Sequence, residues 1–558
     1  MLMKKPLPIG ISDFKEIIDK KYAYVDKSLL IAEVIEEGTK VALVPRPRRF
    51  GKTLNLSMLR YFFEKTGEDT SYLFKDLKIW QNERCRSLQG QFPVIFLTFK
   101  SIKHSSWNQA FKHFRQIISE EFERHAYLVE DDCLSQKEKE KFRTILDEEG
   151  DEGQSATSLR LLIQWLHRYH KKSVILLIDE YDSPAHGAYT AGYYDNLMGF
   201  LRILLSDSLK DNSSLEWAVL TGILRIAKES IFSGLNNIRT FTLLNEGFRD
   251  KFGLLESEVG ELLASYDLAD KLPLFREWYD GYRIGSCAGI YNPWSVLNCL
   301  AEKGELAPYW VNTSDNALIK QLIAQGGEEL KADFEILLQG GTIAQKIEEG
   351  TVFSQLYQGN RAIWMLLLYS GYLAIDAKPV YDIPCPLRIP NREIYALYRS
   401  MILDWFERSI NKSQYLRLLN SLTKGDVATF SEILSEFVLS SVSVFDVPFE
   451  ESEKIYHAFV LGLLVGLKDT YSIKSNREGG LGRYDVMLFP KNSHELGIVI
   501  EFKKAAPSED LEQTATAALQ QIAEKKYAQE LIAYGVSRIL SLGIAFKGKQ
   551  VFTKSEFY

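Results

Sequence analysis

Residues 41–53 decide the fold of the first part of the chain, and they read VALVPRPRRFGKT. The apolar residues at the start of this stretch predict a buried parallel strand, which ends at the prolines. Gly51, Lys52 and Thr53 then lead into an amphipathic helix, which we expect over residues 54–64. This is the arrangement of a phosphate-binding loop, in which backbone N–H groups face the phosphate, lysine adds charge and threonine binds Mg²⁺.

The loop departs from the usual pattern at one position. The full motif GxxxxGK[ST] has a glycine where this chain has Arg46, and Pro47 follows directly. Arginine followed by proline cannot copy the wide turn of a glycine. The first half of the loop must therefore approach phosphate differently, with Arg48 or Arg49 as a candidate source of charge.

Composition sets only broad limits. A length of 558 residues predicts about three or four domains. A hydrophobic content of 46% and a charged content of 25% are ordinary for a soluble globular protein. The net charge of −7 gives no global signature of nucleic-acid binding, so any such binding requires a local patch.

Cysteine usage and hydropathy predict a cytoplasmic location. The five cysteines lack CxxC spacing, which argues against a disulfide framework or a zinc site and fits a reducing compartment. Residues 1–8 are too short and too proline-rich for a signal peptide. No apolar run approaches the roughly 18 to 20 residues that a membrane helix needs, so we expect no membrane association.

Three further strands are expected in the first sheet, over residues 92–99, 174–179 and 215–222. The second of these is continuously apolar until Asp179 and Glu180, as expected for a buried strand with acids at its tip. The carboxyl ends of parallel strands bind ligands in α/β sheets. We expect Asp179 to hold Mg²⁺ and Glu180 to polarise an attacking water; the alternative is a strand that ends in solvated acids.

Several nearby residues allow two interpretations. Thr221 either senses a terminal phosphate or simply ends its strand, and the sequence does not decide between them. Arg225 could act as an arginine finger, although a surface salt bridge is favoured. Residues 7–40 are favoured as an extension that packs on the first strand, with nucleotide contact by Asp26 or Lys27 as the alternative.

Between the two ends of the chain the pattern is mainly helical. A polar helical region is expected over 106–170, with a charge-dense, solvated insertion at 136–152. Residues 250–340 have helical periodicity throughout. A helix followed by a β-hairpin over 353–395 is typical of a winged-helix-like module, although a structural connector is equally compatible, and amphipathic helices follow over 393–440.

The C-terminal segment carries a second group of functional candidates. Residues 482–503 predict two antiparallel strands around a polar turn centred on Ser493, so that residues whose numbers sum to 986 lie opposite each other. Asp485 then faces Glu501, and Lys503 shares their face of the sheet.

This convergence of charge has a chemical use. Two carboxylates and a lysine are costly to bury on an apolar sheet unless a cation lies between the acids. Two carboxylates can hold Mg²⁺ against a phosphodiester, and a lysine can orient the attacking water or neutralise developing charge. The alternative is a salt-bridged strand face.

Taken together, the motifs resemble the bacterial AAA-ATPase-like family, whose members typically carry a C-terminal PD-(D/E)xK nuclease-type domain. The resemblance is carried by RPRRFGKT at 46–53, YVDK at 24–27, LIDEYD at 177–182, SIFSGLNN at 230–237, YDGYR at 279–283, YNPWS at 291–295 and the D-x(15)-E-x-K spacing from Asp485 to Lys503. It implies a P-loop NTPase that uses ATP and Mg²⁺, and the family's own loop also carries arginine where Arg46 stands.

The resemblance also implies roles for residues outside the two strands. Glu453 matches the family's first acidic position, and His457 lies one turn further on the same helix face, as a core or a catalytic residue. Gln521 lies in the helix that follows the nuclease core, where it could contact the water or the phosphate.

The predicted fold class is α/β, with four domains. They are an AAA-ATPase-like P-loop NTPase domain with a parallel sheet flanked by helices (1–250), a helical lid (251–345), a winged-helix-like or helical connector (346–445) and a restriction-endonuclease-like α/β domain (446–558). The expected catalytic residues are Glu180, Asp485, Glu501, Lys503 and Gln521; the nucleotide-binding residues are Arg48, Arg49, Gly51, Lys52, Thr53, Asp179 and Thr221; the metal ligands are Thr53, Asp179, Glu453, Asp485 and Glu501.

Two functions follow from this assignment. The first is an ATP-coupled, Mg²⁺-dependent nuclease with nucleic acid, expected to be DNA, as its partner. The second is a regulatory NTPase switch whose C-terminal domain binds nucleic acid or a protein without cutting. The complete trio of Asp485, Glu501 and Lys503 favours the first, and assembly into a homo-oligomer through the ATPase domain stays open.

Overall fold

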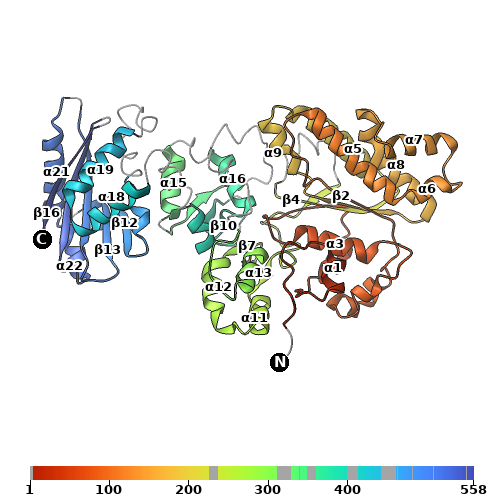
Figure 1. The fold of residues 1–558 in the computed structure, drawn as a ribbon, viewed down its shortest axis with the longest axis horizontal. Helices are drawn as coiled ribbons and strands as arrows, with labels where there is room; N and C mark the ends of the chain where they lie inside the picture. Colours follow the sequence, from red (N-terminus) through yellow and green to blue (C-terminus); the bar gives the residue numbers. More distant parts are fainter. Residues whose placement is uncertain are drawn as a thin grey trace. The chain divides into compact units, whose positions relative to one another are not determined.

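The computed structural model groups the chain into two compact units (Figure 1). The first comprises Met1–Ser314 and Ala344–Ile394, and the second comprises Asp315–Ile343 and Tyr395–Tyr558. The structure describes residues 4–224, 237–310, 328–338, 340–347, 360–378, 380, 383–398, 412–440, 460, 463–479, 482–506, 508–547 and 550–558. The finer division into four domains remains a prediction.

A parallel sheet forms the centre of the first unit, as the sequence predicts, but it has five strands, and the fifth, at Ile238–Thr240, was not predicted. Its order is β2-β3-β4-β1-β5. The strands are β1 (Val41–Pro45), β2 (Val94–Thr98), β3 (Val174–Asp179), β4 (Leu215–Gly222) and β5 (Ile238–Thr240). Every residue of β1 and β3 is buried, which explains their continuously apolar sequences.

Helices cover both faces of this sheet (Figure 1). One face carries α5 (Trp107–Arg124), α6 (Tyr127–Glu130), α7 (Gln136–Leu146), α8 (Glu152–His170) and α9 (Ser183–Thr190), and the other carries α1 (Phe14–Asp19) and α3 (Lys52–Phe63). The unit also contains α2 (Leu29–Glu37), α4 (Glu83–Arg86), α10 (Tyr194–Leu209) and 3₁₀ turns at Ser71–Leu73 and Lys78–Gln81.

The charge-dense stretch at 136–152 differs from the expected solvated insertion. It forms α7 and the start of α8, and α7 begins with a capping box between Ser135 and Glu138. Phe142 of α7 is fully buried and its ring lies 4.8 Å from that of Phe122. One apolar face of this charged helix therefore belongs to the core.

Residues 250–340 are not helical throughout. The described part contains α11 (Glu256–Ser265), a 3₁₀ turn at Ala269–Lys271, α12 (Leu272–Tyr279), α13 (Pro293–Ala301) and α15 (Glu328–Leu338). It also contains an antiparallel sheet of β6 (Leu254–Leu255), β7 (Tyr282–Ile284) and β8 (Cys287–Tyr291) in the order β6-β8-β7. Gly281, Gly285 and Gly289 have positive φ in and around this hairpin, and such short strands leave almost no periodic signal.

The helix and hairpin predicted over 353–395 are present. They are α16 (Asn360–Ser370), β10 (Ala374–Ile375) and β11 (Cys385–Arg388), and β9 (Ile343–Gln345) completes a sheet of order β10-β11-β9. The comparison with a winged helix remains a prediction.

A five-stranded mixed sheet forms the centre of the second unit. Its strands pair in chain order: β12 (Tyr471–Gly479), β13 (Gly482–Pro490), β14 (Gly497–Lys504), β15 (Ile539–Lys547) and β16 (Gln550–Phe557). Only β14 and β15 are parallel, and α21 (Leu511–Glu524) and α22 (Ala528–Ala533) connect them. This agrees with the predicted α/β fold class.

Alternating side chains of this sheet contact two different layers. Val486, Leu488, Ile498 and Ile500 pack in a core with α18 (Lys412–Lys424), α19 (Val427–Ser440) and the 3₁₀ turn Val465–Leu467. Met487, Phe489 and Val499 pack with Ile522 of α21 and Leu531 of α22. Asp485, Glu501 and Lys503 therefore lie on the face that α21 covers. Among the described residues, no helix has both the length and the apolar character needed to cross a membrane.

Candidate functional site

The loop at 46–51 connects the end of β1 to the first turn of α3. Gly51 is the N-cap of α3 and has a φ of 81°, which favours glycine. A β-carbon at this position would meet no other atom within 4 Å, so the left-handed backbone, and not a lack of space, is what favours glycine here. Helix α3 begins with Lys52 and Thr53, and the backbone N–H groups and dipole at a helix N-terminus favour an anion.

The side chain of Lys52 is held across the loop. Its ammonium group donates to the carbonyl oxygens of Arg46 at 3.0 Å and Pro47 at 2.9 Å. Burial lowers the pKa of Lys52, while the nearby carboxylates of Glu180 and Asp179 oppose that shift. These two contacts fix the lysine charge inside the loop, at the start of α3.

Asp179 lies between two hydroxyl groups. Thr53 Oγ1 donates to Asp179 Oδ2 at 2.7 Å, and Thr221 Oγ1 donates to Asp179 Oδ1 at 2.7 Å. Asp179 and Thr221 are completely buried at the ends of adjacent strands β3 and β4. The fold therefore brings together three predicted site residues that are separated by 126 and 42 positions in the sequence.

Glu180 follows Asp179 in a left-handed backbone conformation with a φ of 50°. This conformation is uncommon for residues other than glycine, and it occurs often at functional sites. The Glu180 carboxylate is half-buried and lies close enough to Lys52 and Arg49 to interact electrostatically with both.

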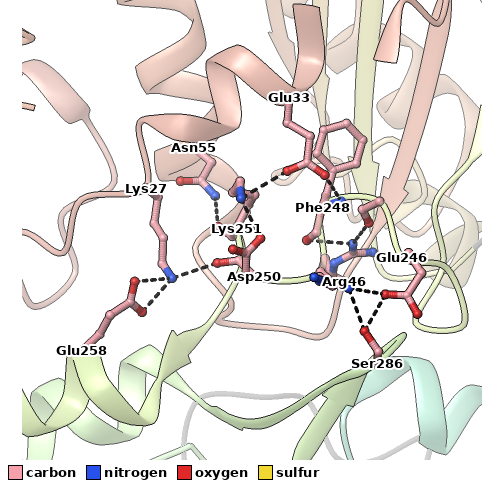
Figure 2. Close-up of polar contacts among 12 residues, drawn as sticks. Lys27, Glu33, Arg46, Asn55, Glu246, Phe248, Asp250, Lys251, Glu258 and Ser286 are labelled. Atoms are coloured by element: carbon pink, nitrogen blue, oxygen red, sulfur yellow. Dashed lines mark hydrogen bonds and ion pairs between the residues drawn. The ribbon is translucent and has the colours of Figure 1, made fainter. Parts of the chain in front are cut away.

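Arg46 is fully buried, and its guanidinium group lies next to Phe248 (Figure 2). Its Nη1 atom donates to the carbonyl oxygens of Phe241 at 2.6 Å and Pro45 at 2.9 Å, and its Nη2 atom donates to those of Phe248 at 3.2 Å and Gly247 at 3.3 Å. Burial lowers the pKa of Arg46 to about 9. The residue that replaces the usual glycine therefore anchors the loop to the segment 241–248.

Figure 2 also shows contacts of Asp250, Lys251 and Glu258, which follow this segment in the chain. Lys27 donates to both carboxylate oxygens of Glu258, at 2.7 and 2.8 Å, and to the carbonyl oxygen of Asp250 at 3.0 Å. Lys251 pairs with Glu33 of α2 at 3.2 Å. These contacts support the packing interpretation of the N-terminal extension, because they assign Lys27 to a largely buried ion pair.

The two other loop arginines contact the region that begins α13. The Arg49 guanidinium carbon lies 4.2 Å from the centroid of the Trp294 ring, and Arg49 has a φ of 67°. Asn292 Nδ2 donates to the Arg48 carbonyl oxygen at 3.4 Å. The YNPWS motif at 291–295 therefore packs against the phosphate loop, a contact that the sequence did not predict.

Asp182 is a buried residue that the sequence assignment did not include. One of its carboxylate oxygens accepts hydrogen bonds from the N–H groups of Ile223 at 2.9 Å and Leu224 at 2.7 Å. Burial raises the pKa of Asp182 to about 6. Tyr181 adds a hydrogen bond from its hydroxyl to the Leu224 carbonyl at 2.7 Å, so the acidic tip of β3 holds the chain that leaves β4. Arg225 lies outside the described residues.

In the second unit, β13 and β14 pair in the predicted register. Val486 lies opposite Ile500 and Leu488 opposite Ile498, so the numbers of paired residues sum to 986 as predicted. Next to these pairs, the Asp485 N–H donates to Glu501 Oε2 at 3.3 Å, and the Phe502 N–H donates to Asp485 Oδ2 at 2.7 Å. The two carboxylates are therefore neighbours.

Gln521 of α21 links the remaining members of the group. Lys503 Nζ donates to Gln521 Oε1 at 2.8 Å, and Gln521 Nε2 donates to Glu501 Oε1. Helix α21 comes this close because Gly543, which pairs with Glu501 from β15, has no side chain: a β-carbon there would lie 2.3 Å from the Ala515 carbonyl oxygen. The fold thus brings all four predicted residues together.

Tyr527 is a buried neighbour of Gln521. It is 1% exposed and hydrogen-bonds to Gln521, and burial raises its pKa. Tyr527 was not assigned to the site from the sequence. Tyr527 follows Gln521 by six residues and lies beyond the end of α21 at Glu524, so helical spacing does not link the two side chains.

The donor sets suit magnesium at both sites. Mg²⁺ binds hard oxygen ligands, commonly one or two carboxylates together with water and phosphate. Asp485 with Glu501, and Asp179 with the Thr53 hydroxyl, supply such ligands. Within the described residues, no group of three or more His, Cys, Asp or Glu side chains could hold a metal. Glu453 and His457 lie outside the described residues.

Two protein-family models match separate parts of the chain. Residues 8–232 match the model of a family described as Predicted AAA-ATPase, and residues 451–556 match that of the PD-(D/E)XK nuclease superfamily. These matches confirm the resemblance seen in the sequence: the loop and Asp179 lie in the first match, and Asp485, Glu501, Lys503 and Gln521 lie in the second. The chain is also 27% identical, over 98% of its length and 97% of the relative's, to a protein of Azotobacter chroococcum mcd 1 described as an uncharacterized protein in the vnfD 5′ region.

Proposed function

We propose that this protein binds and hydrolyses ATP, and that its nucleotide state controls a Mg²⁺-dependent nuclease that cleaves phosphodiester bonds in DNA. The observation that carries the proposal is the contact network of Asp485, Glu501, Lys503 and Gln521, in a chain whose other unit holds Lys52, Thr53 and Asp179 at the N-terminus of α3. A module that only bound nucleic acid would not need this buried acid–lysine group.

In the nucleotide site, each residue has a proposed role. Lys52 would neutralise phosphate charge, and Thr53 and Asp179 would hold the magnesium ion and its water shell. Glu180 would orient and polarise the attacking water, and Thr221 would respond to the terminal phosphate. Arg48 and Arg49 are the proposed additional sources of positive charge beside the loop.

In the nuclease site, Asp485 and Glu501 would hold Mg²⁺, which lowers the pKa of a bound water and neutralises the phosphodiester. Lys503 would orient that water or stabilise the charge that develops on the phosphate. Gln521 would keep Lys503 and Glu501 in place, because its amide accepts from one and donates to the other. The first acidic ligand proposed from the sequence, Glu453, would complete the metal site.

Cleavage of DNA tests the nuclease assignment. The full-length protein is incubated with plasmid and linear DNA in the presence of Mg²⁺, with and without ATP. We expect cleavage by the wild type and none by Asp485→Ala or Lys503→Ala. No cleavage by the wild type, or unchanged cleavage by these variants, would contradict the proposal; DNA binding without cleavage would support the regulatory switch instead.

Nucleotide binding and hydrolysis test the first site separately. Lys52→Ala should abolish binding of a fluorescent ATP analogue, because the buried ammonium charge is lost. Glu180→Gln should bind the analogue normally but fail to release phosphate. Normal hydrolysis by Glu180→Gln would show that another group activates the water.

A further inference from the structure

Trp294, at the start of α13, contacts two separate parts of the first unit. The face of its ring holds the Arg49 guanidinium at 4.2 Å, and its indole N–H donates to the Tyr309 carbonyl oxygen at 3.3 Å. One side chain therefore touches both the phosphate loop and the segment 305–310.

Glu393 joins the same helix to both segments through which the chain leaves the first unit. Ser295 Oγ donates to Glu393 Oε2 at 2.7 Å, and the Trp310 N–H donates to Glu393 Oε1 at 2.7 Å. The Glu393 carboxylate is 1% exposed. The borders of the unit follow closely, at Ser314 and Ile394.

Arg49 has an evident alternative partner. A cation–π contact at a half-open site is weaker than a charge-assisted hydrogen bond between guanidinium and phosphate. Arg49 belongs to the loop that faces the proposed phosphate position, and its side chain is exposed. A bound nucleoside triphosphate would therefore compete with Trp294 for the Arg49 guanidinium.

We propose that Trp294 and Glu393 form a relay that reports occupancy of the phosphate loop to the two chain segments leading into the second unit. In the free state, Arg49 rests on Trp294. When phosphate draws Arg49 away, the first turn of α13 is released from the loop, and Ser295 and Tyr309 carry the change to Glu393 and Trp310. The proposal rests on nucleotide binding at the loop and specifies how that binding would be communicated.

Hydrogen–deuterium exchange of the full-length protein tests the relay without requiring any catalytic activity. Exchange is measured with and without a non-hydrolysable ATP analogue and Mg²⁺. In the wild type we expect the analogue to change exchange by at least about threefold in peptides covering 292–301, 305–310 and 388–394. Trp294→Leu should still bind the analogue within a few-fold of the wild type, but the changes at 305–310 and 388–394 should be lost.

Two further variants refine the test. Trp294→Phe keeps an aromatic face for Arg49 but removes the N–H donor, so it should retain the response at 292–301 and lose that at 305–310. It also serves if Trp294→Leu fails to fold. Trp80→Leu is the matched control, because Trp80 also stacks with an arginine, Arg86, at 5.9 Å, but away from the loop; it should respond as the wild type does.

The outcomes separate the relay from the proposed function. Changes confined to residues 46–53 and 179–182 in the wild type, or an unaltered response in Trp294→Leu, would overturn the relay even if the protein cleaves DNA. Transmission to 388–394 that depends on Trp294 would support the relay even if no cleavage is found. Absence of analogue binding by the wild type would remove both the relay and the nucleotide site.

Discussion

The site around Asp179 and the site around Glu501 are assembled in different ways. The first collects a loop, the start of α3 and the ends of β3 and β4 at one edge of a parallel sheet, and its shape depends on distant segments. The second is built across two adjacent antiparallel strands and one covering helix. A site of the first kind can be disturbed from far away in the sequence, whereas a site of the second kind is fixed mainly by strand register.

Replacement of Arg46 should cause the largest loss of stability of all the changes proposed, and the loss should be confined to the unit that contains the Asp179 site. Arg46→Met removes the donor to the carbonyl oxygens of Phe241, Gly247 and Phe248, and each buried acceptor left unsatisfied costs about 1–3 kcal/mol. Hydrogen exchange across a denaturant series should show β1 destabilised and β15 unchanged.

Arg239→Met provides the matched control for this variant. Arg239 contacts the ring of Phe241 and pairs with Glu37, but its side chain is 61% exposed. We expect its replacement to alter the stability of β1 by no more than about 0.5 kcal/mol. Equal effects of the two substitutions would contradict the anchoring role of Arg46.

The pH dependence of stability should depend on Asp182. Burial raises its pKa from the ordinary value of 3.8 to about 6, so the folded state binds this proton more tightly than the unfolded state. The resulting stabilisation is fully present below pH 3.8 and is lost as the pH rises through 6, which amounts to about 3 kcal/mol. Asp182→Asn should lack this decline in unfolding free energies measured from pH 3.5 to 7. Parallel profiles for the two proteins would show that Asp182 ionises normally.

In the second region, Lys503 and Lys504 offer a matched pair on opposite faces of β14. Lys503→Ala should lower the rate of DNA cleavage by about 100-fold, as expected for loss of a group that stabilises transition-state charge. Lys504→Ala should stay within about threefold of the wild type. A reversed order would mean that the register places the wrong lysine at the site.

Tyr527→Phe should have the smallest effect of these changes, a small decrease in the rate of DNA cleavage. Loss of one hydrogen bond to Gln521 costs about 1 kcal/mol, which corresponds to about a fivefold decrease in cleavage if the amide becomes less well oriented. Nucleotide binding should not change. A decrease as large as that of Lys503→Ala would indicate that Tyr527 contacts the substrate directly.

The second site could be predicted closely because its geometry is local. A turn centred on Ser493 determines which residues of β13 and β14 face each other, and side-chain alternation then places Lys503 beside Glu501. The approach of Gln521 was implied by family resemblance alone. The reason for that approach, the absence of a side chain at Gly543, becomes visible only when β15 is paired with β14.

The first site was predicted less completely because much of it depends on long-range contacts. The motifs identified Lys52, Thr53 and Asp179, since they occur at the ends of strongly apolar strands. The partners of Arg46 lie 195 to 202 residues further along the chain, and nothing in the spacing of the sequence links them. The hydrogen bonds that Asp182 accepts from Ile223 and Leu224 were not predicted, for the same reason. Nor were the short strands over 282–291, whose sequence has no periodic signal.

The central claim is that nucleotide at the first site controls cleavage at the second. Its most direct test is the initial rate of plasmid cleavage in Mg²⁺, with and without saturating ATP, for the wild type and Lys52→Ala. The account predicts that ATP accelerates wild-type cleavage by at least about tenfold, while Lys52→Ala retains a Mg²⁺-dependent basal rate that ATP does not alter. Equal wild-type rates with and without ATP, or a normal ATP response in Lys52→Ala, would contradict it.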